Sequence, residues 1–174
     1  LWGPPGVGKT TLAKIIANQL DTPFYTLSAV NSGVKEVREV IDKATKGRFF
    51  NEQSPILFID EIHRFSKSQQ DSLLAAVETG AITLIGATTE NPSFEVIRPL
   101  LSRCQVYVLK SLEKQDLEEL LNRALTKDIV LKDMHIEVKE TEALFRFSGG
   151  DARKLLGILD LVTSATTDNT LIID

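Results

Sequence analysis

The chain has 174 residues, 43% of them hydrophobic, and its net charge of -4 excludes a uniformly basic surface, so any contact with nucleic acid needs a local patch. A single cysteine, Cys104, excludes an internal disulfide, and a zinc cluster is excluded because only two histidines accompany it. No apolar run approaches the ~20 residues that span a bilayer, and no signal-peptide pattern is present, so we expect a cytoplasmic protein without membrane contact.

A glycine-rich loop opens the chain, and only Leu1 and Trp2 precede it. Such a loop follows a buried strand, and there is no initiator methionine. We therefore expect a fragment whose first strand is largely missing. The C-terminus, Leu171–Asp174, has the pattern of an element that begins and is then cut short.

Strand and helix patterns then alternate along the chain. The apolar spacing predicts helices over 10–20, 34–47 and 68–79, and strands over 24–27, 56–59, 82–87 and 106–109. The run at 56–59 has no polar alternation, which is typical of a strand buried on both faces. We therefore predict the α/β class, with a mainly parallel sheet flanked by helices in residues 1–110.

The pattern becomes helical after Lys110, and we expect residues 111–174 to form a small all-helical lid. Ser111 is the expected N-cap of its first helix, because acidic residues and a leucine series follow. Further helices are expected over about 141–148 and 151–163, separated by a glycine pair.

The opening loop matches the phosphate-binding pattern G-x-x-x-x-G-K-[ST] and leads directly into a helix. Its glycines allow backbone amides to surround phosphate oxygens at a helix N-terminus. Lys9 would contact the β- and γ-phosphates, and the Thr10 hydroxyl would bind Mg²⁺. The predicted ATP-binding residues are Gly3, Pro4, Pro5, Gly6, Val7, Gly8, Lys9, Thr10 and Thr11. The alternative is a glycine-rich turn with a solvated lysine.

Two carboxylates follow the buried run at 56–59. Asp60 is expected to hold Mg²⁺ through its water shell, and Glu61 to polarise the water that attacks ATP. An ordinary exposed loop is the alternative when such a pair stands alone. Because a phosphate loop lies upstream, we favour catalysis, and Glu61 favours hydrolysis over simple nucleotide binding.

Small polar residues end the next predicted strand. Thr88 or Asn91 could hydrogen-bond the attacking water or the γ-phosphate. Turn formation is the alternative for this segment, since Asn91-Pro92 is itself a turn signal.

Arg153 lies in the first turn of a predicted helix capped by Asp151. A cation there opposes the helix dipole, which suggests an anionic partner such as bound nucleotide. The alternative is a salt bridge to Asp151 or another acid.

Together these motifs resemble the AAA+ ATPases. The segment LFIDEIHRFSKSQQDSLLAAVETGAITLIGATTENPSF, followed by RPLLSRCQVYVL, is similar to the family of replication-associated recombination protein A and the Werner-helicase-interacting ATPase, which is related to clamp loaders. The resemblance covers essentially the whole chain. It implies a homo-oligomeric, DNA-stimulated ATPase at stalled or gapped replication forks, at the nucleoid, with single-stranded-DNA-binding protein as a partner.

The resemblance also implies roles for individual residues. Thr88 falls at the polar sensor at the strand end, and Arg153 matches the second sensor of the lid. Ser102-Arg103-Cys104 matches the finger motif of clamp loaders. Arg103 would then reach into the site of a neighbouring subunit and neutralise charge on the transferred phosphoryl group. The alternative for Arg103, taken without the resemblance, is an ordinary cation at a helix end.

Other functions stay open. A clamp-loader or branch-migration subunit is one, and a protein-remodelling ATPase is another, although the segment around Gly33 and Val34 lacks the aromatic residue of a typical pore loop. A scaffold that binds ATP without much turnover is a further alternative, against which Glu61 and Arg103 count. For a DNA-directed machine we expect Gly33, Val34 and Lys35, with Arg38 one turn further, to face the DNA.

Overall fold

The computed structural model describes residues 1–29, 33–48, 54–165 and 170–173. The chain divides into two compact units. The first contains Leu1–Gly3 and Gly8–Leu109, and the second contains Pro4–Val7 and Lys110–Asp174. The middle of the glycine loop therefore belongs to a different unit from the two ends of the same loop.

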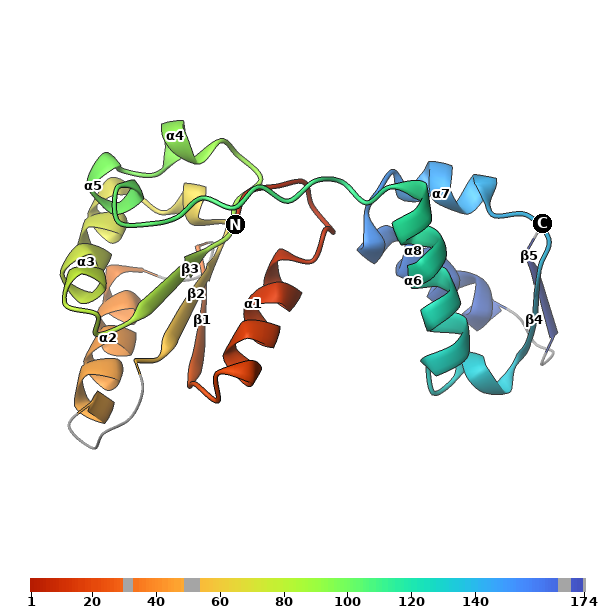
Figure 1. The fold of residues 1–174 in the computed structure, drawn as a ribbon, viewed down its shortest axis with the longest axis horizontal. Coiled ribbons are helices and arrows are strands. Elements are labelled where there is room, and N and C mark those ends of the chain that lie inside the picture. The colour runs from red at the N-terminus through yellow and green to blue at the C-terminus, as the bar shows by residue number, and fades with distance from the viewer. Residues whose placement is uncertain (30–32, 49–53, 166–169, 174) are drawn as a thin grey trace. The chain divides into compact units, whose positions relative to one another are not determined.

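The first unit alternates between helix and strand (Figure 1). Its elements are α1 (Lys9–Gln19), β1 (Phe24–Ser28), α2 (Val34–Arg48), β2 (Ile56–Asp60), the 3₁₀ turn η1 (Ile62–Arg64), α3 (Lys67–Glu78), β3 (Thr83–Gly86), α4 (Pro92–Glu95) and α5 (Arg98–Leu101). The strands form a parallel sheet in the order β1-β2-β3. The predicted α/β class with a parallel sheet is confirmed.

Strand β2 is buried on both faces, as its unbroken apolar run predicts. Leu57 and Ile59 point into one hydrophobic cluster that includes residues of α2 and α3. Phe58 points the other way, where it packs with Ala13 of α1 and stacks on Phe24 with ring centroids 5.9 Å apart. Figure 1 shows α2 and α3 on one side of this sheet and α1 on the other. Parallel strands covered in this way need apolar side chains at successive positions.

Trp2 extends the sheet beyond β3. It forms parallel bridges with Thr88 and with Val108, and its amide donates to the Tyr107 carbonyl at 2.9 Å. The Leu109 amide donates back to the Trp2 carbonyl at 2.7 Å. The segment 106–109 is therefore an isolated bridge and not the regular strand expected, because it pairs with the sheet only through Trp2.

The second unit is mainly helical but also contains strands. Its elements outside the glycine loop are α6 (Lys114–Lys127), the 3₁₀ turn η2 (Leu131–Asp133), β4 (His135–Val138), α7 (Glu142–Ser148), α8 (Ala152–Ala165) and β5 (Thr170–Ile173). Strands β4 and β5 pair in parallel. The expectation of an all-helical lid was thus wrong on this point. The short β4 alternates between exposed and half-buried residues, which gives a weak strand signal.

The helices of the second unit share one apolar core. Leu117 and Leu121 of α6 pack there with Leu155 and Leu159 of α8 and with Phe145 of α7. Their spacing of four residues keeps each pair on one helix face, as the sequence predicts. None of the helices in the described ranges combines the length and the apolar composition that crossing a membrane requires.

The start of α6 differs from the expectation. Its N-cap is Glu113, whose side chain forms a capping box with Asp116, and Ser111 lies outside the helix. The reason is a tertiary contact: the Leu112 amide donates to the Gly150 carbonyl at 3.3 Å. That bond keeps residues 111 and 112 out of the helix, so the cap shifts to the next acidic residue.

Candidate functional site

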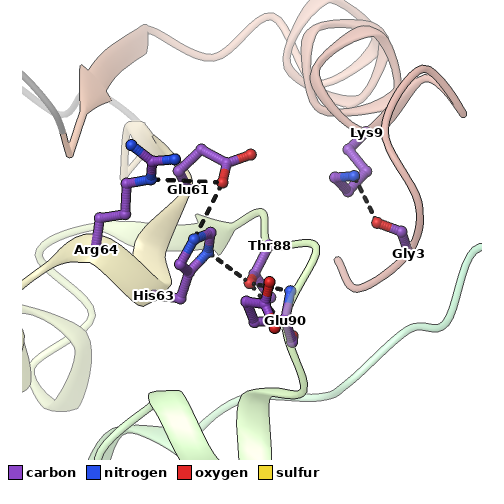
Figure 2. Close-up of polar contacts among 7 residues, drawn as sticks. All are labelled: Gly3, Lys9, Glu61, His63, Arg64, Thr88 and Glu90. Carbon is purple, nitrogen blue, oxygen red and sulfur yellow. Dashed lines mark hydrogen bonds and ion pairs between the residues drawn. The ribbon is translucent and has the colours of Figure 1, made fainter.

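The ends of the glycine loop lie beside the sheet in the first unit. The Lys9 ammonium is buried and donates to the Gly3 carbonyl at 2.7 Å (Figure 2). A Cβ atom at Gly3 would lie 2.3 Å from the Leu109 carbonyl oxygen, so only glycine fits there. The loop is thereby fixed at one end against the sheet, and its lysine folds back over the loop backbone.

The other end of the loop becomes the N-terminus of α1. Gly8 is the N-cap with φ 91°, a left-handed conformation that glycine adopts without strain. The first amide bonded back along the helix is that of Leu12, which donates to the Gly8 carbonyl at 2.8 Å, and no side chain caps this end. The amides of Thr10 and Thr11 are therefore available as donors, and the first turn contains no acidic residue. These are the features that a phosphate group requires.

The middle of the loop contacts the start of α8 within the second unit. The Gly6 carbonyl accepts the Ala152 amide at 3.2 Å, and Gly6 has φ +71°. A Cβ atom at Gly6 would lie 1.7 Å from an Asp151 carboxylate oxygen. Glycine is thus required at this position by its backbone conformation and also by the close approach of Asp151.

The expected acidic pair ends strand β2. Asp60 is its last residue and is half-buried. Glu61 follows with φ 55° and ψ 46°, a left-handed conformation that is uncommon for a residue with a side chain. Such strain, of order 1–3 kcal/mol, persists only where the surroundings impose it, and it is found more often at functional sites.

The turn η1 directs the chain back toward β3. The buried Ile62 donates its amide to the Ala87 carbonyl at 3.0 Å. Its side chain fills the space over Gly86, where a Cβ atom would lie 3.0 Å from the Ile62 Cδ1 atom. The turn is thereby anchored on β3, and the next residue, His63, is brought to the end of that strand.

His63 links the two neighbouring strand ends. Its Nε2 lies 3.2 Å from the Glu61 carboxylate, and its Nδ1 lies 2.9 Å from the Thr88 hydroxyl. The same carboxylate oxygen is 4.0 Å from the Arg64 guanidinium. Figure 2 shows Glu61, His63 and Thr88 in one continuous series of polar contacts. His63 was not predicted as a site residue from the sequence. The signal was its position in a tight turn directly after the acidic strand end.

The polar residues after β3 have different surroundings. Thr88 is buried, and its hydroxyl accepts the Glu90 amide at 3.0 Å as well as contacting His63. Asn91 caps the short helix α4, where its side-chain oxygen accepts the Ser93 amide at 3.0 Å. The turn role that was the alternative for this segment therefore has contacts at both Thr88 and Asn91, and Thr88 in addition contacts His63.

Arg103 lies after α5 and is partly exposed. Its guanidinium forms an ion pair with Glu78 at the end of α3, and it donates to the Pro99 carbonyl at 2.7 Å.

Burial raises the pKa of the neighbouring Cys104 thiol, so this cysteine is a neutral, weakly reactive group.

Arg153 lies in the first turn of α8, as expected. Asp151 caps this helix by accepting the amides of Arg153 and Lys154 at 2.8 and 3.2 Å. The Arg153 side chain is exposed and, in the described part of the chain, forms no ion pair with a carboxylate. The alternative of a salt bridge to Asp151 is therefore not realised.

The donors for a metal ion are few in number. In the described ranges no group of three or more His, Cys, Asp or Glu side chains could hold one. Mg²⁺ suits this set nonetheless, because it keeps several waters and needs only one or two protein ligands when phosphate oxygens complete its shell. Thr10 and Asp60, both half-buried in the first unit, are oxygen donors of that type.

Comparison with known proteins gives matches across most of the chain. Replication-associated recombination protein A of Escherichia coli strain K12 is 48% identical over 170 residues, which cover 93% of this chain and 37% of that protein. The ATPase WRNIP1 of Dictyostelium discoideum is 49% identical over 170 residues, which cover 97% of this chain and 19% of that protein. The chain thus spans well under half the length of these relatives.

Solved structures give the same fold. A Thermotoga maritima structure described as the RuvB Holliday junction branch migration motor superposes with a TM-score of 0.74 at 33% identity, and the match covers 94% of this chain and 53% of that one. Residues 1–112 match the model of the ATPase family associated with various cellular activities. With its glycine loop at an uncapped helix start and two carboxylates at the end of the adjoining parallel strand, the chain belongs to this AAA family of ATPases.

Proposed function

We propose that this chain binds Mg·ATP and hydrolyses it, as the ATPase unit of a protein that acts on DNA in replication-associated recombination and repair. One observation carries the proposal. The phosphate loop leads into the uncapped start of α1, in the same unit as strand β2, which ends at Asp60 and is followed directly by Glu61. Residues 1–110 then form the nucleotide-binding core and residues 111–174 its lid.

The loop binds the triphosphate through its backbone. The amides of Thr10 and Thr11 donate to phosphate oxygens, and the dipole of α1 favours the negative charge. Lys9 exchanges its contact with the Gly3 carbonyl for the β- and γ-phosphates. Thr10 and Asp60 hold Mg²⁺, which when bound neutralises charge on the phosphate oxygens. The remaining loop residues, Pro4–Val7, shape the cradle.

Glu61 acts on the attacking water. Its carboxylate is a third exposed, which leaves it accessible to water while His63 holds one of its oxygens. It accepts a proton as the water attacks the γ-phosphorus. Thr88, buried at the neighbouring strand end, is placed to hydrogen-bond this water or the γ-phosphate. Asn91 is assigned the same kind of contact, for which it would have to release the Ser93 amide.

Two arginines neutralise the charge that develops during phosphoryl transfer. Arg103 serves the site of a neighbouring subunit in a homo-oligomer, and Arg153 of the lid contacts nucleotide. The exposed guanidinium of Arg153 is free of carboxylate partners in the described residues, as such a role requires. The names of the similar proteins, a recombination protein and a branch migration motor, support both the assembly and the DNA substrate.

Contact with DNA is assigned to the start of α2. Gly33, Lys35 and Arg38 are exposed there, and Lys35 forms only a loose 3.9 Å pair with Glu39. The proposal includes single-stranded-DNA-binding protein as a partner and a cytoplasmic, nucleoid-associated location. Ser32, which precedes Gly33 in the segment compared above with a pore loop, lies outside the described residues.

The test is ATP turnover by the full-length protein with duplex, single-stranded and forked DNA compared side by side. We expect turnover without DNA to be measurable, and at least one DNA to stimulate it severalfold. Stimulation by casein and by none of the DNAs would instead indicate a protein-remodelling ATPase.

A further inference from the structure

We propose that His63 is a positioning residue for ATP hydrolysis, which holds the Glu61 carboxylate through Nε2 and ties its orientation to Thr88 through Nδ1. The inference rests on the proposed function, because it assigns Glu61 to the attacking water. It adds His63 to that site, and the role of His63 is argued from its contacts with Glu61 and Thr88, all within the first unit.

The hydrogen positions follow from what each partner can do. An ionised carboxylate only accepts, so the contact of His63 Nε2 with Glu61 at 3.2 Å needs the ring proton on Nε2. In the neutral ring Nδ1 is then an acceptor, and the Thr88 hydroxyl 2.9 Å away donates to it. That hydroxyl in turn accepts the Glu90 amide at 3.0 Å. The Glu90 carbonyl, 3.3 Å from the same hydroxyl, is a second and longer acceptor for its single proton. When the hydroxyl donates to Nδ1, the donors run from the Glu90 amide to the Glu61 carboxylate, and each bond of such a series strengthens the next.

The surroundings hold His63 in this place. The side chain of His63 is only 14% exposed. Ile62 anchors the turn on β3 through the Ala87 carbonyl and by packing against Gly86. The Thr88 end is buried at 3% exposure. Both partners of the imidazole therefore lie at the ends of neighbouring paired strands, and the buried turn holds the ring between them.

The consequence concerns the geometry of Glu61. In the described part of the chain, the contacts of its carboxylate fall on one oxygen, Oε2, so Oε1 remains available to accept a proton from water. Without His63 the side chain regains rotational freedom, and the fraction of time in the productive orientation falls. Thr88 contacts the same imidazole ring as Glu61. A movement of Thr88 caused by its contact with the γ-phosphate would therefore also move the Glu61 carboxylate. His63 therefore acts on turnover and not on ATP affinity.

The test compares three substitutions at one position in the full-length protein. His63→Gln keeps a donor where Nε2 stood and so preserves the contact with Glu61. His63→Asn is shorter, keeps a polar group near Thr88 and cannot reach Glu61. We expect His63→Ala and His63→Asn to lower kcat about tenfold, and His63→Gln to recover most of the loss, with the Kd for a fluorescent ATP analogue within twofold throughout. The matched control is His135→Ala, the only other histidine of the chain, exposed in β4.

The outcomes separate this inference from the function on which it rests. A wild-type protein with no turnover would reject the proposed function itself. Measurable wild-type turnover with His63→Ala within twofold of it would overturn the positioning role alone. Equal loss in the Gln and Asn variants would also overturn it, because a purely structural defect does not distinguish the two amides.

Discussion

Arg103 forms an ion pair with Glu78, which lies at the C-terminal end of α3 in the same chain. The two side chains are 40% and 46% exposed. Pairs with that much exposure contribute roughly 0–1 kcal/mol, because water and salt screen them. Glu78 therefore orients Arg103 only weakly, which is compatible with the proposed exchange of this partner for a phosphate group in a neighbouring subunit.

The first prediction follows from this weak pairing. Arg103→Ala should lower ATP turnover of the assembled protein by about 100-fold or more, since an arginine supplied in trans contributes on the order of 10³–10⁵ in related reactions. Glu78→Gln is the control for loss of the ion pair and should stay within threefold of the wild type. Steady-state kinetics with a parallel ATP-binding assay measure both. A large defect in Glu78→Gln would mean that the pair itself is needed.

The same substitution tests whether Arg103 acts between subunits. Mixing Arg103→Ala protein with Glu61→Gln protein should restore a substantial fraction of turnover, because the mixed oligomer contains sites with an intact Glu61 beside an intact Arg103. Neither variant alone should be active. If mixing gives no recovery while light scattering shows mixed assemblies, Arg103 does not act in trans.

A second prediction concerns Gln70, a polar side chain that is 1% exposed in α3. Its amide nitrogen donates to the Phe65 and Glu95 carbonyls at 3.0 Å, and its oxygen accepts the Ile97 amide at 2.9 Å. Gln70→Leu leaves these backbone groups unsatisfied and should lower the free energy of unfolding by about 3 kcal/mol. Gln19→Leu, at the exposed end of α1, should change it by no more than about 0.5 kcal/mol. Urea denaturation measures the stability of both variants. Equal unfolding midpoints for Gln70→Leu and Gln19→Leu would mean that the buried amide does not stabilise the fold.

A third prediction separates two glycines of the phosphate loop. Both have positive φ, but a Cβ atom would strike the Asp151 carboxylate at Gly6 and meets nothing within 4 Å at Gly8. Gly6→Ala should therefore destabilise the protein by about 1–3 kcal/mol more than Gly8→Ala, the usual cost of overpacking. Thermal unfolding without nucleotide measures the difference. A smaller effect at Gly6 than at Gly8 would mean that Asp151 does not occupy this position.

The sequence was sufficient for the parts of the fold that follow from strong local patterns. The unbroken apolar run at 56–59 predicted a buried parallel strand, and the alternate burial of Leu57 and Phe58 on opposite faces explains why. The positions of the glycine loop and of the two acids could be predicted for a similar reason. Each motif lies directly beside the element that identifies it: the loop precedes a helix, and the acids follow an apolar strand.

Other features depend on contacts between distant residues, and the sequence could not reveal them. Strand β4 pairs with β5 more than thirty residues later along the chain. The cap of α6 moves because Leu112 bonds to Gly150. His63 gains its partners only because Ile62 anchors the turn on β3. In each case a tertiary hydrogen bond or strand pairing outweighs a weak local preference.

A fourth prediction addresses the DNA. Lys35→Ala with Arg38→Ala removes two exposed cations from the start of α2. The slope of log K against log salt for DNA binding should fall by about 2, since each lost phosphate contact releases roughly one counterion fewer. Lys43→Ala with Lys46→Ala makes the same change of charge near the other end of α2 and should leave the slope unchanged. Identical slopes in both double variants would remove α2 as the DNA-binding element.

On the proposed mechanism, the loop at the start of α1 and the acids at the end of β2 serve one Mg·ATP. Isothermal titration calorimetry of the full-length wild type, Lys9→Ala and Glu61→Gln, combined with turnover on the same samples, tests it most directly. We expect ATP binding by the wild type and by Glu61→Gln, loss of binding in Lys9→Ala, and turnover in the wild type alone. A wild-type protein without affinity for Mg·ATP, or a Glu61→Gln variant that hydrolyses ATP at the wild-type rate, would contradict it.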